Sequence, residues 1–285
     1  MMKIEKFISK ANYWATPIYE HFPSLFFPEH HLRFKAYCVG TGKTGTTSMD
    51  AIFSKQYRSM HQPELRFLIY KILALANGKI DESEFTRYVK HRDRRLGLEM
   101  DSSALNYYLI DILVNEFSDA KFILTVRDCY SWIESSFAQH MFTWETQNWF
   151  NHFLRDFLDF RFGSRKKHAK EEAILAEKGL YTLDGYFSSW REHNSKVLAT
   201  VPKERLLIVK TTEINQSLQR IEEFLGIPPG TLPHKVRKNV RRKKFKKLNI
   251  LSQIDKDFLE EKANFHCKEL MDKYFPEVKG FNSLR

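Results

Sequence analysis

A glycine-rich loop that joins an apolar segment to a helix is the feature that most limits how this chain can fold. Residues 34–40 read FKAYCVG and have the composition of a short strand that ends in glycine. Residues 41–48 read TGKTGTTS, and we expect a helix from Thr46 to about residue 56. A strand, a tight loop and a helix N-terminus in this order surround one anion with backbone N–H groups and the positive end of a helix dipole. The alternative is a glycine-rich turn without a ligand.

The Gly42-Lys43-Thr44 triplet looks like the end of a nucleotide-binding P-loop, but its spacing does not fit. That loop has the pattern GxxxxGK[ST], which requires its first glycine at position 37. The residue there is Tyr37, which argues against a nucleoside-triphosphate site. The loop still contains groups that suit a phosphate, because its glycines allow tight turns and Lys43 adds a cation. Hydroxyl groups at the start of the helix come from Thr46, Thr47 and Ser48.

Strand and helix patterns alternate along the rest of the chain. Residues 121–126, KFILTV, form a continuous apolar run typical of a buried parallel strand, and residues 206–210, LLIVK, are a second candidate. This alternation predicts an α/β fold in a single domain, with a mostly parallel central sheet and helices on both faces. Ligands of such sheets bind at the carboxyl ends of the strands, where the glycine loop lies. Helices are expected at 65–77, at 103–117 with Ser102 or Ser103 as N-cap, from about 131, at 184–199 and at 215–225.

Most of the net charge of +11 lies in one segment. Residues 235–247, KVRKNVRRKKFKK, contain nine Lys or Arg and no acidic residue. Such a segment is compatible with a nucleic acid, with an anionic membrane surface, with one small anionic ligand, or with a solvated surface.

Cysteine usage and hydropathy indicate the cellular environment. Cys38, Cys129 and Cys267 are far apart and give neither a metal-binding spacing nor a disulfide framework. No apolar run reaches the roughly 20 residues needed to span a bilayer, and the N-terminus lacks the pattern of a secretory signal. We therefore expect a cytoplasmic protein without a metal site, although the N-terminal aromatic residues leave peripheral membrane contact open.

A second phosphate-binding pattern follows the strand at 121–126. Residues 122–136 read FILTVRDCYSWIESS, so Arg127 ends a buried strand and Ser135 comes eight residues later. An arginine fork and a hydroxyl group can hold one phosphate. With this motif added to the glycine loop, the chain resembles the sulfotransferase family. Its members transfer a sulfuryl group from 3′-phosphoadenosine 5′-phosphosulfate (PAPS) and release the bisphosphate PAP.

The resemblance covers residues 34–227 and is closer to bacterial and Golgi-type members than to cytosolic aryl sulfotransferases. The glycine loop is similar to the family's 5′-phosphosulfate motif, and the second motif is similar to its 3′-phosphate motif. Residues 206–227 look like the family's late strand, acidic turn and helix. The residues that the resemblance implies for donor binding are Gly42, Lys43, Thr44, Gly45, Thr46, Thr47, Ser48, Arg127 and Ser135.

Several positions depart from the family pattern. Gly42 and Cys129 stand where prolines are usual, and Ser48 stands where cytosolic members often have an adenine-stacking tryptophan. Adenine must then stack elsewhere, and Tyr181 is a candidate by rough position only.

The resemblance also implies a general base and a charge-stabilising lysine. Lys43 would stabilise charge that develops on the 5′-phosphate side. Glu64 looks like the base of Golgi-type and many bacterial members, and His61 is the nearby alternative. Glu99 and Asp101 come next in the expected cleft, with ordinary strand-end polarity as the alternative.

The flanking segments are interpreted less directly. We expect an N-terminal extension at 1–33, a PAPS-binding core at 34–227, and a basic segment and helix at 228–285. Family members close the 3′-phosphate site with a basic C-terminal segment, which makes Lys238, Arg241 and Arg242 candidates for donor binding. The aromatic stretch at 140–162 could line an acceptor pocket, or form core or a dimer contact.

The acceptor stays open, since a small molecule, a glycan or a lipid could supply the hydroxyl or amine group, and the oligomeric state is not predicted. Two other functions remain as alternatives. One is a P-loop kinase or NTPase, which Tyr37 disfavours. The other is a non-enzymatic polyanion-binding protein, which the basic segment suggests. We rank the second last and expect no nucleic-acid partner, because it leaves the Arg127 motif unexplained.

Overall fold

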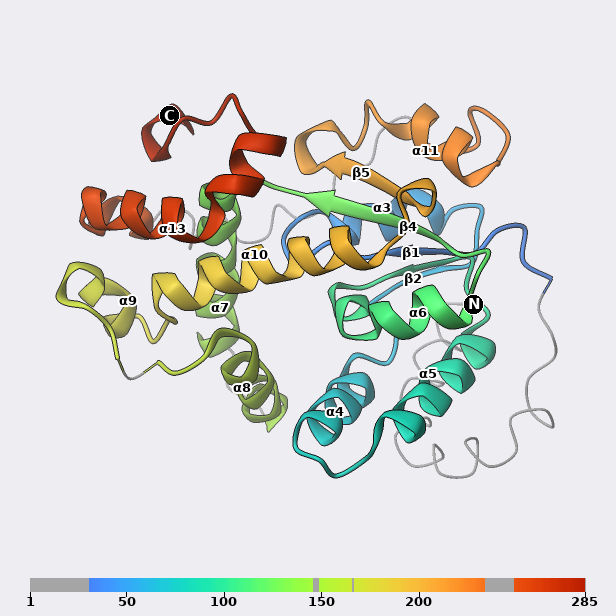
Figure 1. The fold of residues 1–285 in the computed structure, drawn as a ribbon, viewed down its shortest axis with the longest axis horizontal. Coiled ribbons are helices and arrows are strands. Elements are labelled where there is room, and N and C mark those ends of the chain that lie inside the picture. The colour runs from blue at the N-terminus through green and yellow to red at the C-terminus, as the bar shows by residue number, and fades with distance from the viewer. Residues whose placement is uncertain (1–30, 146–148, 166, 234–248, 285) are drawn as a thin grey trace.

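The computed structural model describes residues 31–145, 149–165, 167–233 and 249–284. A five-stranded sheet lies at its centre, with the strand order β2-β3-β1-β4-β5 and every neighbouring pair parallel (Figure 1). The strands are β1 (Ala36–Cys38), β2 (Ser59–His61), β3 (Met100–Ser102), β4 (Lys121–Val126) and β5 (Leu206–Lys210). The chain is therefore a single α/β domain with a parallel sheet, as the alternating pattern predicts.

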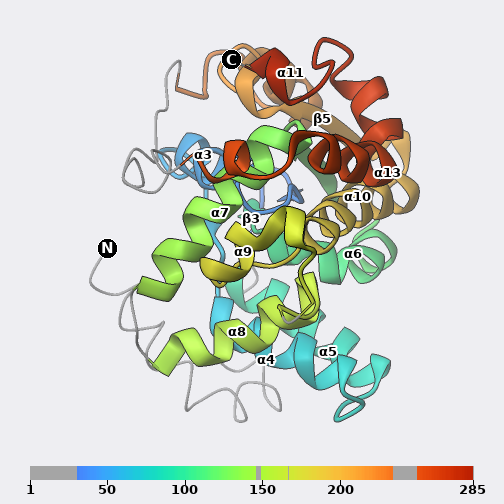
Figure 2. The same ribbon diagram turned by 90° about the vertical axis from the view of Figure 1, so that its left-hand side faces the viewer.

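Helices cover both faces of this sheet. One buried cluster joins the strands to α3 and α11, and the other joins them to α6, α7, α10 and α13. Figures 1 and 2 show α11 near one end of the molecule and α4 and α5 near the other. The α-helices are α3 (Thr46–Phe53), α4 (Leu65–Ala76), α5 (Glu82–Leu96), α6 (Ile110–Glu116), α7 (Cys129–Glu145), α8 (Trp149–Phe162), α9 (Ala173–Glu177), α10 (Leu183–Thr200), α11 (Leu218–Leu225) and α13 (Lys256–Tyr274).

Local signals explain most helix ends. Asn77 caps α4 and Gly78 follows with φ 66°, so the Asn-Gly pair stops that helix as predicted. Gly226 ends α11 with φ 71°. The hydroxyl of Thr182 accepts a hydrogen bond from the Gly185 N–H and begins α10.

Two local predictions need correction. The helix expected from Ser103 starts as a 3-10 segment, η1 (Ala104–Leu109), which Ser103 caps by accepting from the Leu105 N–H, and only then continues as α6. Strand β2 was not predicted at all. It is a three-residue edge strand without a fully buried residue, so it has no apolar run by which the sequence could reveal it.

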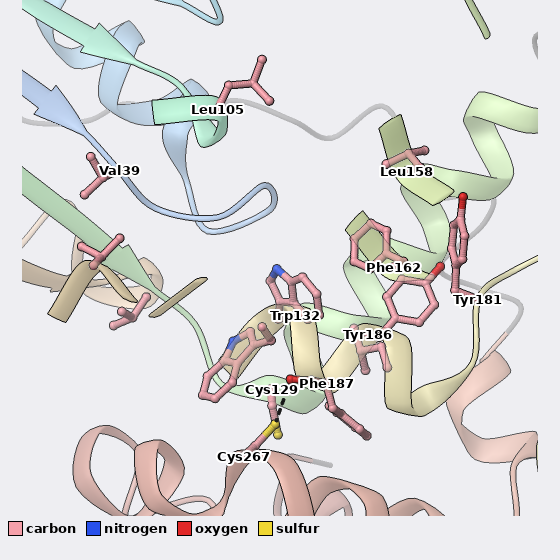
Figure 3. Close-up of a cluster of buried hydrophobic side chains, with 14 of the residues drawn as sticks. Val39, Leu105, Cys129, Trp132, Leu158, Phe162, Tyr181, Tyr186, Phe187 and Cys267 are labelled. Carbon is pink, nitrogen blue, oxygen red and sulfur yellow. Dashed lines mark hydrogen bonds between the residues drawn. The ribbon is translucent and has the colours of Figure 1, made fainter. Parts of the chain in front are cut away.

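The C-terminal helix belongs to the same core. In Figure 3, Cys267 of α13 lies beside Cys129 of α7 and Phe187 of α10, and all three are fully buried. The backbone N–H of Cys129 also donates to the sulfur of Met271. The basic segment at 235–247 and the N-terminal aromatic residues lie outside the described residues. None of the described helices is long and apolar enough to span a membrane.

Candidate functional site

The glycine loop connects β1 to α3 with two residues in the left-handed region. Gly45 has φ 105° at the N-cap of α3, and Lys43 has φ 75°. A side chain at Gly40 would not fit, because its Cβ would lie 1.9 Å from Thr125 Oγ1 and 2.7 Å from the Thr125 carbonyl oxygen. The loop is thus pressed against the end of β4. Gly40 is required by the lack of space, and Gly45 by its positive φ.

Hydrogen bonds from two threonine side chains hold the loop in place. The buried hydroxyl of Thr44 donates to the Thr41 carbonyl at 2.7 Å and lies 2.9 Å from Thr125 Oγ1. The hydroxyl of Thr211, which follows β5, donates to the carbonyls of Thr44 and Val126 at 2.7 and 2.9 Å. The Thr44 side chain therefore has a structural task in the loop, and its backbone N–H also donates within the loop, to the Thr41 carbonyl at 3.3 Å.

The second motif is held directly against the first. The guanidinium of Arg127 donates to Ser131 Oγ at 2.8 Å and to the Lys43 carbonyl at 3.5 Å. The indole of Trp132 donates to the Gly42 carbonyl at 2.8 Å. Burial lowers the pKa of Arg127, against the opposing charges of Asp128 and Glu134. A desolvated guanidinium beside a loop of N–H groups favours an anion.

Ser135 lies one turn beyond Ser131 on α7 and is almost fully buried. Residues four apart share one face of a helix, so Ser131 and Ser135 lie on one face of α7. Arg127 precedes the helix and reaches this face through its hydrogen bond to Ser131. The carboxylate of Asp128 accepts from the Ser131 N–H at 2.8 Å, which caps the helix start. Ser131 was not singled out from the sequence, although its spacing from Arg127 could have shown it.

His61 ends β2 and points at the start of α3. Its Nε2 lies 3.2 Å from Thr46 Oγ1 and 3.3 Å from Thr47 Oγ1. The structure therefore brings an imidazole to the two hydroxyl groups at the helix N-terminus.

Glu64 is held in a network of arginines. It lies in the left-handed region at the N-cap of α4, and both of its carboxylate oxygens accept from Arg95 of α5. Arg92 Nε lies 4.0 Å from the same carboxylate, and Arg92 Nη1 donates to Asp101 at 2.8 Å. This buried network joins α4, α5 and β3, so Glu64 and Asp101 both neutralise arginines.

Glu99 was expected in the cleft, and that expectation is wrong. It precedes β3, at the amino edge of the sheet, whereas the glycine loop lies at the carboxyl edge. Its carboxylate accepts from the Arg33 side chain and from the backbone N–H of Arg58 at 2.8 Å. Glu99 therefore links the segments that contain Arg33 and Arg58 at the amino edge of the sheet.

Tyr181 does not offer a face for adenine. Its ring is fully buried against Phe162 and Tyr186, and its hydroxyl donates to Asp159 at 2.7 Å (Figure 3). The three basic candidates Lys238, Arg241 and Arg242 lie outside the described residues.

One further cation reaches the loop. Arg161, in the last turn of α8, donates through Nη2 to Thr41 Oγ1 and through Nε to Ser189 Oγ at 3.0 Å. No motif marks this residue, because its position depends on how α8 and α10 pack together. The sequence placed it only inside an aromatic stretch.

Two buried histidines lie close to these cations. His140 Nδ1 lies 2.7 Å from the Tyr186 hydroxyl, and His193 Nε2 donates to the Val39 carbonyl at 2.8 Å. Burial and the charge of Arg161 lower the pKa of each to about 3, and Lys43 and Arg165 add to the effect at His140. Both imidazoles are therefore neutral near pH 7.

Comparison with known proteins places the chain in a family. Residues 35–240 match the family model described as a sulfotransferase domain. Among solved structures, a sulfotransferase from Alicyclobacillus acidocaldarius is 16% identical, with 81% of this chain and 96% of that chain covered and a TM-score of 0.43. The sulfotransferase STF9 from Mycobacterium avium is 13% identical, with 93% and 82% covered and a TM-score of 0.49. No curated protein matches the chain.

Proposed function

We propose, from the premise that the chain belongs to the sulfotransferase domain family, that it transfers the sulfuryl group of PAPS to a hydroxyl or amine group of an acceptor. In this reaction the bond between sulfur and the bridging oxygen of the 5′-phosphate breaks. The acceptor oxygen or nitrogen bonds to sulfur and loses its proton, and PAP leaves. PAPS is thus a co-substrate, and the residues of the loop and of α7 have the chemistry to hold its two anionic ends.

The observation that carries this proposal is the direct contact between the two phosphate motifs. Arg127 reaches the Lys43 carbonyl, and Trp132 reaches the Gly42 carbonyl. A bisphosphate needs two neighbouring anion sites. The loop N–H groups and the start of α3 supply one, and Arg127 with Ser135 supplies the other.

Each loop residue has a separate proposed task. Lys43 stabilises the charge that develops on the 5′-phosphate as the sulfuryl group leaves. The hydroxyls of Thr46 and Thr47 and the other backbone N–H groups of the loop hold that phosphate. The N–H groups of Thr44 and Ser48 already donate to backbone carbonyls within the loop. Gly45 permits the turn that aims these groups at one point, since its φ is 105°.

For the general base we favour His61 over Glu64. His61 Nε2 lies within hydrogen-bond distance of hydroxyl groups at the phosphate end of α3, and an ordinary imidazole accepts protons near neutral pH. Both carboxylate oxygens of Glu64 already accept from Arg95, and the carboxylate faces Arg92, so it is engaged elsewhere. Glu64 then serves to position the turn that carries His61.

The remaining parts of the proposal concern the acceptor and the C-terminal segment. A small molecule, a sugar or a lipid alcohol fits the reaction equally. We retain the basic segment with Lys238, Arg241 and Arg242 as a contact to the 3′-phosphate, on its charge alone.

The test is calorimetric titration of the full chain with PAP in the absence of magnesium, with ATP and ADP as controls. Micromolar affinity for PAP with little binding of ATP is the expected result. Binding of ATP that requires magnesium would favour a kinase or NTPase instead. If PAP binds, labelled PAPS and a panel of hydroxyl and amine acceptors then identify the acceptor by transfer of label.

A further inference from the structure

Arg161 is a partly buried cation at the glycine loop, and its partners are all neutral. Its Nη2 and Nε donate to the hydroxyls of Thr41 and Ser189, and its guanidinium carbon lies 5.0 Å from the Phe162 ring centre. Within the part of the chain that the structure describes, no carboxylate pairs with it, and its Nη1 makes no hydrogen bond. Both N–H groups of Nη1 are thus left for another acceptor.

Arg92 shows what a purely structural buried arginine looks like in the same protein. Burial would lower the pKa of Arg92, but the carboxylates of Asp101 and Glu64 raise it above its usual value. For Arg161 the effect of burial on the pKa outweighs that of the neighbouring groups. Burial lowers the pKa of Arg161, and only the phenols of Tyr108 and Tyr107 oppose the shift. Burial raises the pKa of Tyr108 to about 12, so that phenol carries no charge near pH 7.

Even a partly buried charge is less favourable without a counter-ion than with one. The arrangement around Arg161 therefore favours the arrival of an anion. Lys43 and Arg161 both lower the pKa of His140, which places the two cations around the same part of the interior. An anion held by Lys43 lies within the field of Arg161.

The strand order separates Arg161 from the proposed 3′-phosphate site. Arg127 follows β4, which lies on one side of β1. Tyr107 and Tyr108 belong to η1, which follows β3 on the other side of β1, and Arg161 lies near these two rings. His61 ends β2, one strand farther in the same direction. Arg161 thus lies on the side of the loop from which the proposed base would act.

We infer that Arg161 binds the sulfuryl group of the donor, next to Lys43, and orients it for the acceptor. This inference rests on the proposed function, because it assumes that PAPS occupies the loop. The guanidinium offers Nη1 to sulfuryl oxygens while Nη2 and Nε stay fixed by Thr41 and Ser189. Because PAP lacks the sulfuryl group, Arg161 discriminates the donor from the product.

The test compares the affinities of PAPS and PAP for the full chain and for Arg161→Met, with sulfur-labelled PAPS and no acceptor present. We expect PAPS affinity to fall roughly tenfold to a hundredfold, the range for loss of a hydrogen bond to a charged group, with PAP affinity unchanged. Arg161→Lys keeps the charge and should recover part of the PAPS affinity.

Arg165→Met is the matched control. Arg165 also lowers the pKa of His140, but its Nε donates to Asp159 at 3.1 Å. The substitution of Arg165 therefore removes a nearby positive charge and leaves the contact between Arg161 and the loop in place. It should leave the ratio of PAPS to PAP affinity as in the wild type. An equal loss of PAPS and PAP affinity in Arg161→Met, or an unchanged ratio, would overturn the inference. If the wild type binds neither ligand, the proposed function itself fails.

Discussion

The indole N–H of Trp132 donates to the carbonyl of Gly42 across 2.8 Å, so a side chain of the second motif fixes the backbone of the first. Trp132 is almost fully buried, and its ring centre lies 6.3 Å from that of Tyr186 (Figure 3). The core on which α7 packs therefore extends to the loop, and the two proposed anion sites share one support.

Replacement of Trp132 by Phe removes this hydrogen bond and keeps an aromatic ring in the core. We expect PAP affinity to fall by roughly threefold to tenfold, since one neutral hydrogen bond contributes about 1 kcal/mol. Calorimetric titration of the variant checks this, and the unfolding temperature reports any packing loss. PAP affinity equal to that of the wild type would show that the loop needs no such support.

Gly40→Ala tests whether the loop is pressed against β4. Its Cβ would meet the Thr125 side chain at 1.9 Å and the Thr125 carbonyl at 2.7 Å, and overpacking of this kind costs about 1–3 kcal/mol. We expect a lower free energy of unfolding in urea and weaker PAP binding. Gly42→Ala is the control, because a Cβ there meets no atom within 4 Å. Equal stability of the two variants would contradict the contact.

His61→Asn and Glu64→Gln separate the base from its support. His61→Asn should lower turnover by roughly 10²-fold or more, as loss of a general base does, while PAP affinity is retained. Glu64→Gln weakens the pairing with Arg95 and should act mainly on stability. Turnover is measured as PAP release with an acceptor from the screen. If only Glu64→Gln loses turnover while its unfolding temperature stays normal, Glu64 is the base.

Acid should destabilise the protein through its two buried histidines. Burial lowers the pKa of His140 and of His193 to about 3. Between about pH 6.5 and pH 3 the unfolded chain binds protons at these residues and the native state does not, so stability falls as the pH falls. Each histidine contributes up to about 1.4 kcal/mol per pH unit well below pH 6.5.

His193→Gln checks this dependence and still offers a donor to the Val39 carbonyl. The free energy of unfolding, measured in urea between pH 7 and pH 5, should fall less steeply in the variant than in the wild type. Parallel curves for the two proteins would show that His193 is not held neutral in the native state.

The elements that the sequence predicts well have their signal in consecutive residues. The apolar run of β4 and the Asn77-Gly78 stop of α4 are local features, and both lie where expected. The glycine loop is also recognisable, because positive φ at Gly45 and the lack of space at Gly40 both demand glycine.

The features that the sequence did not reveal depend on distant partners. Strand β2 exists because it pairs with β3, which lies about 40 residues later. Glu99 was expected in the cleft but lies at the amino edge of the sheet, because the sequence does not show at which end of a short strand a residue lies. Tyr181 was a candidate for stacking on adenine but is fully buried, because an aromatic residue can pack in the core as well as against a ligand. Arg161 meets Thr41 from 120 residues away, and no spacing rule describes such a contact.

The pairing of β1 has a consequence for the order of assembly during synthesis. In the described sheet, β1 pairs with β3 and β4, so its first strand partner is made more than 60 residues after it. The segment that bears the glycine loop therefore leaves the ribosome before any strand exists with which β1 can pair. Parallel pairing between segments far apart in the sequence is also slow. We expect nascent chains that end before β4 to be protease-sensitive and prone to aggregation. The proposed donor site can then form only after β4 and α7 have been made.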